Sequence, residues 1–328
     1  MPTTEPADLM QDRTADKAKP LYETVKGQSC LLLLSVHEGD YIPKSLHDAD
    51  GCPLGVVNPA DLDRHIAIDH GIREVTRLVA TSTRAHVFRA THSRLVADIN
   101  RFPDESDCVA PTADGTDIPL NSALDKAGRE ARLSRYFHPA IDGLKDFVRE
   151  VAAENGSEPF VICMHSFARS LAEDPRHPKR HDICIFSYPE FGTIPNVEAF
   201  VRVLRQQRPE LIVGKDEPFS ARTPGLRTAR DDKRMASPTS FYAVIERNNV
   251  PNHFALEVCQ DLISDRAGKD RMAETITRAL HATFDFSGSK PKLRDPDRMI
   301  SGSDRSPGLS SEGGLVTGSR QIASRHPQ

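Results

Sequence analysis

Side chains that could carry out chemistry follow three apolar runs of this 328-residue chain. His37, Glu38 and Asp40 follow the first run, and His165 follows the second. Glu257 lies inside the third run, where a carboxylate is costly to bury unless it has a partner or a task. Two histidines and one carboxylate, with a fourth position left to water, form a catalytic zinc site, and a separate carboxylate can then act as general base. On spacing alone the alternative stays open that each histidine is a hydrogen-bonded structural residue.

Two further clusters hold groups that could contact a substrate. Arg94 and Arg101 stand seven residues apart around a short apolar stretch, and arginine holds carboxylates through paired hydrogen bonds. The alternative is a pair of solvated arginines. His65 and Asp69 are four residues apart on a predicted helix and would share a face. The alternative is an ordinary surface contact, as most pairs at this spacing are.

The elements that must position these residues alternate between short apolar, β-branched runs and helical periodicities, which predicts an α/β fold. The expected strands are residues 30–36, 85–90, 159–166, 181–187, 210–215 and 253–258. Several are apolar throughout, as buried strands are. We therefore predict a single three-layer domain with a central mixed, mainly parallel sheet flanked by helices, and function just beyond the strand ends.

Five helices are expected between these strands. The first begins at Asn58-Pro59, an N-cap residue followed by proline, and carries an apolar stripe that ends at Val79. The second follows Pro139 and stops at Asn155-Gly156. The others run from Asn196, surround residues 241–245, and carry Met272, Ile276 and Leu280.

The two ends of the chain differ in composition from its middle. Only 38% of the residues are hydrophobic, and 24 Pro and 19 Gly indicate that part of the chain never packs. Residues 1–28 are polar and mixed in charge, and residues 287–328 are dense in Ser, Gly and Pro without one aromatic residue. We predict that both ends are disordered and that residues 29–286 form the catalytic domain.

Charge and composition exclude several classes of protein. With 43 Lys and Arg against 47 Asp and Glu, and no long basic stripe, a nucleic-acid partner is not expected. No apolar run approaches the roughly 18 residues needed to span a bilayer, and no secretory signal is present, so we expect a cytoplasmic protein without a membrane partner. Six scattered cysteines without a CxxC pair indicate neither a disulfide framework nor a zinc finger. The oligomeric state is left open.

Taken in chain order, the segments around these residues resemble the N-formylglutamate amidohydrolase family. The most specific match is residues 93–101 (SRLVADINR), which is similar to the family's S-R-L-x-x-D-x-N-R. The other matching segments are SVHEGDYIP (35–43), HIAIDHG (65–71), YFHP (136–139), MHSF (164–167), GKDEPF (214–219) and LEVCQDLI (256–263). The resemblance implies a zinc-exopeptidase-like, phosphorylase/hydrolase-like α/β fold.

The resemblance also implies roles in the reaction. His37, Asp40 and His165 would hold zinc, and Glu257 would be the general base. Many members have a neutral residue at the position of Asp40, so Glu38 is the alternative carboxylate ligand.

The same resemblance implies residues that hold the substrate. Arg94 and Arg101 would grip its carboxylates, with Asn100 and Asp69 beside them, and His138 would line the pocket or stabilise the oxyanion. An equal alternative makes His138 a helix-entry residue before a proline. Cys259 stands where arginine is common in the family, which bears on glutamate specificity.

The implied activity is zinc-assisted hydrolysis of an amide on a small carboxylated molecule, with N-formyl-L-glutamate as the reference substrate. One alternative is an exopeptidase or deacylase acting on another N-acyl amino acid or small peptide. The other is a non-catalytic metal- or carboxylate-binding protein with the same fold.

Overall fold

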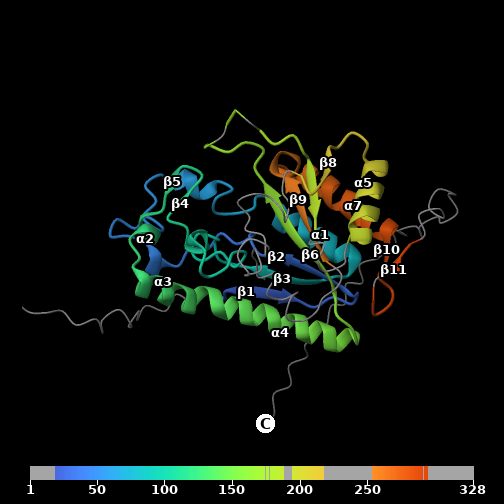
Figure 1. The fold of residues 1–328 in the computed structure, drawn as a ribbon, viewed down its shortest axis with the longest axis horizontal. Helices are drawn as coiled ribbons and strands as arrows, with labels where there is room; N and C mark the ends of the chain where they lie inside the picture. Colours follow the sequence, from blue (N-terminus) through green and yellow to red (C-terminus); the bar gives the residue numbers. More distant parts are fainter. Residues whose placement is uncertain are drawn as a thin grey trace, which may run out of the picture. The chain divides into compact units, whose positions relative to one another are not determined.

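The computed structural model describes residues 19–173, 175–176, 178–187, 194–217, 253–290 and 292–294. Within these residues the centre of the fold is a mixed sheet of seven strands in the order β1-β3-β2-β6-β9-β7-β8 (Figure 1). Its strands are β1 (Tyr22–Val25), β2 (Leu31–Ser35), β3 (His86–Ala90), β6 (Phe160–Phe167), β7 (Ile183–Phe186), β8 (Val213–Lys215) and β9 (His253–Cys259).

The sheet is mainly parallel, as predicted. Strands β3, β2, β6 and β9 run parallel to one another, and β7 runs parallel to β8. Strand β1 pairs antiparallel with β3, and β7 pairs antiparallel with β9. The carboxyl ends of β2, β6 and β9 therefore meet at one edge of the sheet.

Helices cover both faces of this sheet, which confirms the predicted three layers. Helix α4 (His138–Asn155) lies on one face, against β1 and β3, and α1 (Ile72–Thr83), α5 (Ile194–Gln207) and α7 (Arg266–Thr283) lie on the other (Figure 1). The first face is closed by a core in which Leu144, Phe147 and Val148 of α4 pack with Leu34 and Phe88 of the sheet. None of the helices in the described ranges is both long and apolar enough to cross a membrane.

Shorter elements fill the connections. They are two short helices, α2 (Pro119–Ser122) and α3 (Lys126–Arg132), a π-helical turn at Leu133–Phe137, 3₁₀ turns at Lys44–Leu46, Pro59–Asp63, Ser106–Val109 and Gln260–Ile263, and two small hairpins, β4 (Thr112–Ala113) with β5 (Thr116–Asp117) and β10 (Phe284–Asp285) with β11 (Lys292–Leu293).

The six expected strands are all present, but the predicted limits of the folded domain are wrong at both ends. Strand β1 lies inside the segment 1–28 that was predicted to be disordered, and the ring of its Tyr22 stacks on Phe88 with centroids 4.9 Å apart. Strand β11 lies beyond residue 286 and pairs with β10. Strand β1 is held by pairing with β3, far away in the sequence, and β11 by the short hairpin that it forms with β10, and the composition of the two ends reveals neither pairing. The rest of both ends lies outside the described residues.

The first predicted helix is divided into two elements. Asn58 does act as an N-cap, since its side chain accepts a hydrogen bond from the Ala60 N–H, but the turn that it starts ends at Asp63. Helix α1 begins only at Ile72, after Gly71, which has a left-handed φ of 77°. The predicted shared helix face of residues 65 and 69 is therefore wrong, because both lie in the intervening loop.

The other helix predictions that can be checked are confirmed. Helix α4 ends at Gly156, which has the left-handed φ of 68° expected of a C-cap glycine. Helices α5 and α7 occupy the segments predicted for them. The helix predicted around residues 241–245 lies outside the described residues.

The tight turn at Gly71 should be sensitive to any side chain. A Cβ atom there would lie 2.5 Å from the carbonyl oxygen of Ile263, in addition to the cost of a left-handed φ. We expect Gly71→Ala to lower the free energy of unfolding by about 2 kcal/mol or more, measured by urea denaturation. Gly156→Ala is the matched control, since φ is also positive but no atom lies within 4 Å, and should cost only about 1 kcal/mol. Equal losses in the two variants would show that the close contact is unimportant.

Candidate metal centre and active site

The structure brings together the two histidines that the sequence singled out. His37 lies two residues beyond β2, and His165 lies near the carboxyl end of the neighbouring parallel strand β6. Both side chains are buried, and their ring centroids are 4.8 Å apart. Their proximity follows from the parallel register, because residues at the ends of adjacent parallel strands meet at one edge of the sheet.

Asp69 completes this cluster from the loop that precedes α1. Its backbone N–H donates to the carbonyl oxygen of His37 at 2.9 Å, which fixes the loop against the end of β2. Its Oδ2 lies 2.9 Å from Nδ1 of His165 and 3.8 Å from Nδ1 of His37, and it accepts the Ser166 N–H at 3.1 Å. One ligand atom from each of His37, Asp69 and His165 lies within 4.8 Å of the other two, so the cluster could hold a metal ion.

The two carboxylates predicted to be metal ligands lie elsewhere. Asp40 is exposed and lies 3.6 Å from Lys19 and 3.6 Å from Arg73. Glu38 is buried, but its carboxylate faces Arg73 and Arg89 instead of the histidines. The placement of Asp40 as third ligand, and of Glu38 as its alternative, is therefore wrong. The chain turns sharply after His37, where a Cβ on Gly39 would meet the Thr91 backbone at 2.4 Å, and the carboxylates are carried away from the cluster.

A fourth buried group, Asp98, was missed as a functional residue. Its Oδ1 lies 2.7 Å from Nε2 of His37 and accepts the Asn100 N–H at 2.7 Å, while Oδ2 accepts hydrogen bonds from Nε and Nη2 of Arg94. Burial would raise the pKa of Asp98, but His37 and Arg94 hold it well below its usual value. Because Asp98 occupies Nε2 of His37, the other ring nitrogen is directed toward Asp69. The spacing of four between Arg94 and Asp98 was the signal in the sequence.

The electrostatics of the cluster favour a positive charge at its centre. Burial would raise the pKa of Asp69, but the hydrogen bond from His165 and the nearby ring of His37 hold it well below its usual value. Burial would lower the pKa of His165, but Cys163, Glu257 and Asp69 together raise it well above 6.5. The site therefore keeps a carboxylate ionised and draws a proton onto an imidazole, and a divalent cation held by nitrogen and oxygen ligands would meet the same demand.

Glu257 stands beside this cluster as the sequence predicted. It lies on β9 directly opposite His165 in the parallel register. Burial, and next the negative charge of Asp69, raise its pKa to about 7, while His165, Arg94 and Arg101 oppose the shift. A carboxyl group that titrates near neutrality can both accept and return a proton, which suits general acid–base chemistry.

Comparison with known proteins shows the family of the chain. The profile of the N-formylglutamate amidohydrolase family matches residues 29–264, most of the chain. The chain belongs to this family. Membership supports an amidohydrolase, although no match was found among curated proteins.

Two solved structures show that the fold of this family member is shared. A gene product of Agrobacterium tumefaciens has a TM-score of 0.63 at 22% identity and covers 80% of this chain and 96% of its own. An N-formylglutamate amidohydrolase from Ralstonia eutropha has a TM-score of 0.50 at 19% identity and covers 79% of this chain and 94% of its own.

The residues predicted to grip the substrate of this amidohydrolase lie next to the cluster, but they already have partners. Arg94 holds Asp98, and its Nη1 lies 3.7 Å from Oδ1 of Asp69. The Nε of Arg101 donates to Asp107 at 2.7 Å, and its Nη1 donates to the Asn100 carbonyl at 3.0 Å. The side-chain oxygen of Asn100 is buried and accepts no hydrogen bond from the part of the chain that the structure describes. Arg101 thus has an unused guanidinium nitrogen and its charge acts on Glu257, while Asn100 has an unused amide oxygen.

Two other histidines singled out in the sequence lie outside the cluster. His138 is exposed at the first residue of α4, with its ring edge-on to Phe137, so the structure agrees with the helix-entry alternative and gives no support to an oxyanion role. His65 is half-buried, with Nε2 3.5 Å from Asp114. Neither helps to form the cluster.

The contact between Asp98 and His37 predicts a loss of metal affinity when the charge of Asp98 is removed. Carboxylates that orient a ligating histidine typically contribute 10- to 100-fold to metal binding, so we expect Asp98→Asn to weaken Zn²⁺ binding by about that factor in a chelator competition assay. Asp142→Asn, an exposed carboxylate on α4, should leave the affinity unchanged. Equal zinc affinity in both variants, with unchanged circular dichroism, would contradict the orienting role.

Proposed function

We propose that this member of the family hydrolyses the amide bond of an N-formyl or other N-acyl amino acid, with N-formyl-L-glutamate as the reference substrate. The observation that carries the proposal is the buried His37, Asp69 and His165 cluster with Glu257, of pKa about 7, directly beside it. A structural role alone would not require four ionisable side chains to share one buried site, because each charge is costly to bury.

Zinc is the cofactor that this donor set fits best. Two imidazoles and one carboxylate are a common ligand set of catalytic zinc sites, which leave one position open. His37, Asp69 and His165 would hold the ion. When bound, it would polarise the amide carbonyl and make water more acidic.

The side chains then divide the remaining work. Glu257 would take a proton from the water molecule as the water oxygen bonds to the formyl carbon. The same carboxyl group would return that proton to the amide nitrogen as the carbon–nitrogen bond breaks, so that formate and the free amine leave. A pKa near 7 lets one group serve in both directions. Asp98 would keep the ring of His37 in place throughout.

Substrate selection would depend on the two arginines of the site, Arg94 and Arg101. Arg101 has one guanidinium nitrogen, Nη2, without a hydrogen bond in the described residues, and its positive charge acts on Glu257. It is therefore the better placed of the two arginines to bind a substrate carboxylate, since Arg94 is held by Asp98. Arg94 would contribute mainly by keeping Asp98 and Asp69 in position.

A second candidate, a deacylase for other N-acyl amino acids, is favoured by Cys259. This residue stands where an arginine is common in the family, and it is fully buried at the end of β9. It cannot replace an arginine as a carboxylate ligand. Rates on formyl, acetyl and peptidyl amides of several amino acids would separate the two candidates.

Removing the general base should stop hydrolysis without removing the metal. We expect Glu257→Gln to lower kcat by about 10²- to 10⁴-fold, measured as formate release, because a positioned general base contributes that much. Metal analysis should find one zinc per chain in both proteins. Glu154→Gln, a half-exposed residue of α4, is the control. A chain that binds zinc and hydrolyses no N-acyl amino acid would instead be a binding protein, and a chain without stoichiometric zinc would exclude the mechanism.

The role of Arg101 can be tested by pairing two substrates. N-Formylglutamine has the shape of N-formylglutamate without the side-chain charge, so the ratio of their kcat/KM values reports recognition of that carboxylate. Loss of a charge-assisted hydrogen bond should reduce this ratio by about tenfold in Arg101→Ala. Arg149→Ala, on the exposed surface of α4, should keep the ratio of the wild type. An unchanged ratio in Arg101→Ala would assign side-chain recognition to another residue.

A further inference from the structure

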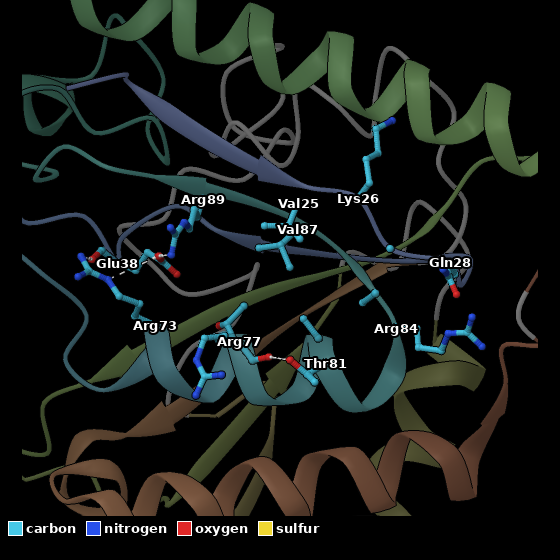
Figure 2. Close-up of a pocket in the computed structure, with 14 residues that line it drawn as sticks. Val25, Lys26, Gln28, Glu38, Arg73, Arg77, Thr81, Arg84, Val87 and Arg89 are labelled. Carbon is cyan, nitrogen blue, oxygen red and sulfur yellow. Dashed lines mark hydrogen bonds and ion pairs between the residues drawn. The ribbon is translucent and has the colours of Figure 1, made fainter. Parts of the chain in front are cut away.

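A second cavity, apart from the candidate active site, lies between α1 and the edge of the sheet formed by β1 and β3 (Figure 2). Its volume is about 340 Å³. None of His37, Asp69, His165 and Glu257 is among the residues that line it. A role in the hydrolysis of the proposed substrate therefore does not account for this cavity.

The lining of the cavity is strongly cationic. Five basic side chains contribute to it against a single carboxylate, that of Glu38. The basic residues are Lys26, Arg73, Arg77, Arg84 and Arg89. Three of the arginines come from one helix and its C-cap, so their like charges repel one another and the arrangement costs stability unless an anion compensates.

One end of the cavity is already neutralised by the protein. Figure 2 shows Arg73 and Arg89 converging on Glu38. The carboxylate oxygen Oε1 of Glu38 lies 3.7 Å from Nε of Arg73 and 3.5 Å from Nη1 of Arg89. Arg73 also donates to the carbonyl oxygen of Glu38 at 2.7 Å. Arg89 has Glu23 as a further partner, and Lys26 has Glu154.

The charges of Arg77 and Arg84 are not compensated in this way. Neither guanidinium group has an ion-pair or hydrogen-bond partner in the part of the chain that the structure describes, and both residues are exposed. They lie seven positions apart, a rise of about 10 Å along a helix. Arg84 also has a left-handed φ of 55°, a C-cap conformation in which glycine is favoured, so a large cationic side chain stands there at a cost in backbone energy.

The wall between these charges is apolar. Val25 and Val87 face the cavity from the sheet in the middle of Figure 2, and Ala80 of α1 and Ala85 also line it. A simple inorganic anion would leave this surface unused. The volume is at the lower end of the range of small-molecule sites, about 300–1,000 Å³.

We propose that this cavity is a second ligand site, which binds a small organic anion that has an apolar body and a phosphate or carboxylate group. The anionic group pairs with the guanidinium group of Arg77 or of Arg84, which lie apart from each other in Figure 2, since guanidinium groups bind both phosphate and carboxylate through paired hydrogen bonds. The apolar body covers Val25 and Val87.

Calorimetric titration of the full chain with four probes tests this site. Phenyl phosphate and benzoate have both features, inorganic phosphate lacks the apolar body, and phenol lacks the charge. We expect the first two to bind, and the stronger of the pair identifies the preferred anionic group. Inorganic phosphate and phenol should each bind at least tenfold more weakly than the stronger ligand.

Variants locate the binding on α1. The double variant Arg77→Ala/Arg84→Ala should weaken binding of the preferred probe by about tenfold or more, because it removes both arginines that could hold the anionic group. Arg266→Ala, with a side chain that is 95% exposed on α7, is the matched control and should bind like the wild type. Arg94→Ala should also retain binding, which separates this cavity from the candidate active site.

The result does not depend on the proposed hydrolysis. Formate release by the double variant should equal that of the wild type, and binding to the cavity is measured whether or not any substrate is hydrolysed. The proposal is overturned if none of the four probes binds, if the double variant binds as tightly as Arg266→Ala, or if Arg94→Ala abolishes binding.

Discussion

The ionised carboxylate of Asp69, buried at the edge of a parallel sheet, is the constraint on which the arrangement of the site depends. A buried carboxylate without partners would cost several kcal/mol. Here it is compensated by the ring of His165, the Ser166 N–H and the nearby guanidinium of Arg94. These partners come from a strand and a loop far apart in the sequence. The fold must therefore be complete before the charge is satisfied, which ties the chemistry of the site to the stability of the sheet.

Backbone geometry at two glycines allows this compensation. Gly39 lets the chain leave β2 against the backbone of Thr91, and Gly71 lets the loop that carries Asp69 turn into α1 beside Ile263. In both places a side chain would collide with backbone atoms. The same turn that leaves His37 inside the cluster carries Asp40 out to the surface. His37 and Asp40 are three residues apart. In a helix this spacing would place both side chains on one face, but here the turn separates them.

The features that could be predicted from the sequence are those set by interactions between residues close together in the chain. The strands, and with them His37, His165 and Glu257, were found because apolar runs are local signals and because parallel strands end together. Asp69 was assigned to the wrong element, since its position depends on a loop that no periodicity marks, and its role as a metal ligand is a proposal. Asp98 was overlooked because its contact with His37 spans 61 residues. Strand β1 was missed since its polar sequence gains order only from pairing with β3.

Two neighbouring residues at the end of β2 face two different charged sites. His37 faces the buried cluster, where its contact with Asp98 holds the ring in place. Glu38 faces Arg73 and Arg89, which line the cavity beside α1. Burial raises the pKa of Glu38, and Arg73 and Arg89 partly oppose this. Because Arg73 also donates to the Glu38 carbonyl oxygen, a change in the position of Arg73 would act on the backbone next to His37. The backbone shared by His37 and Glu38 is a physical connection by which the cavity could influence the cluster.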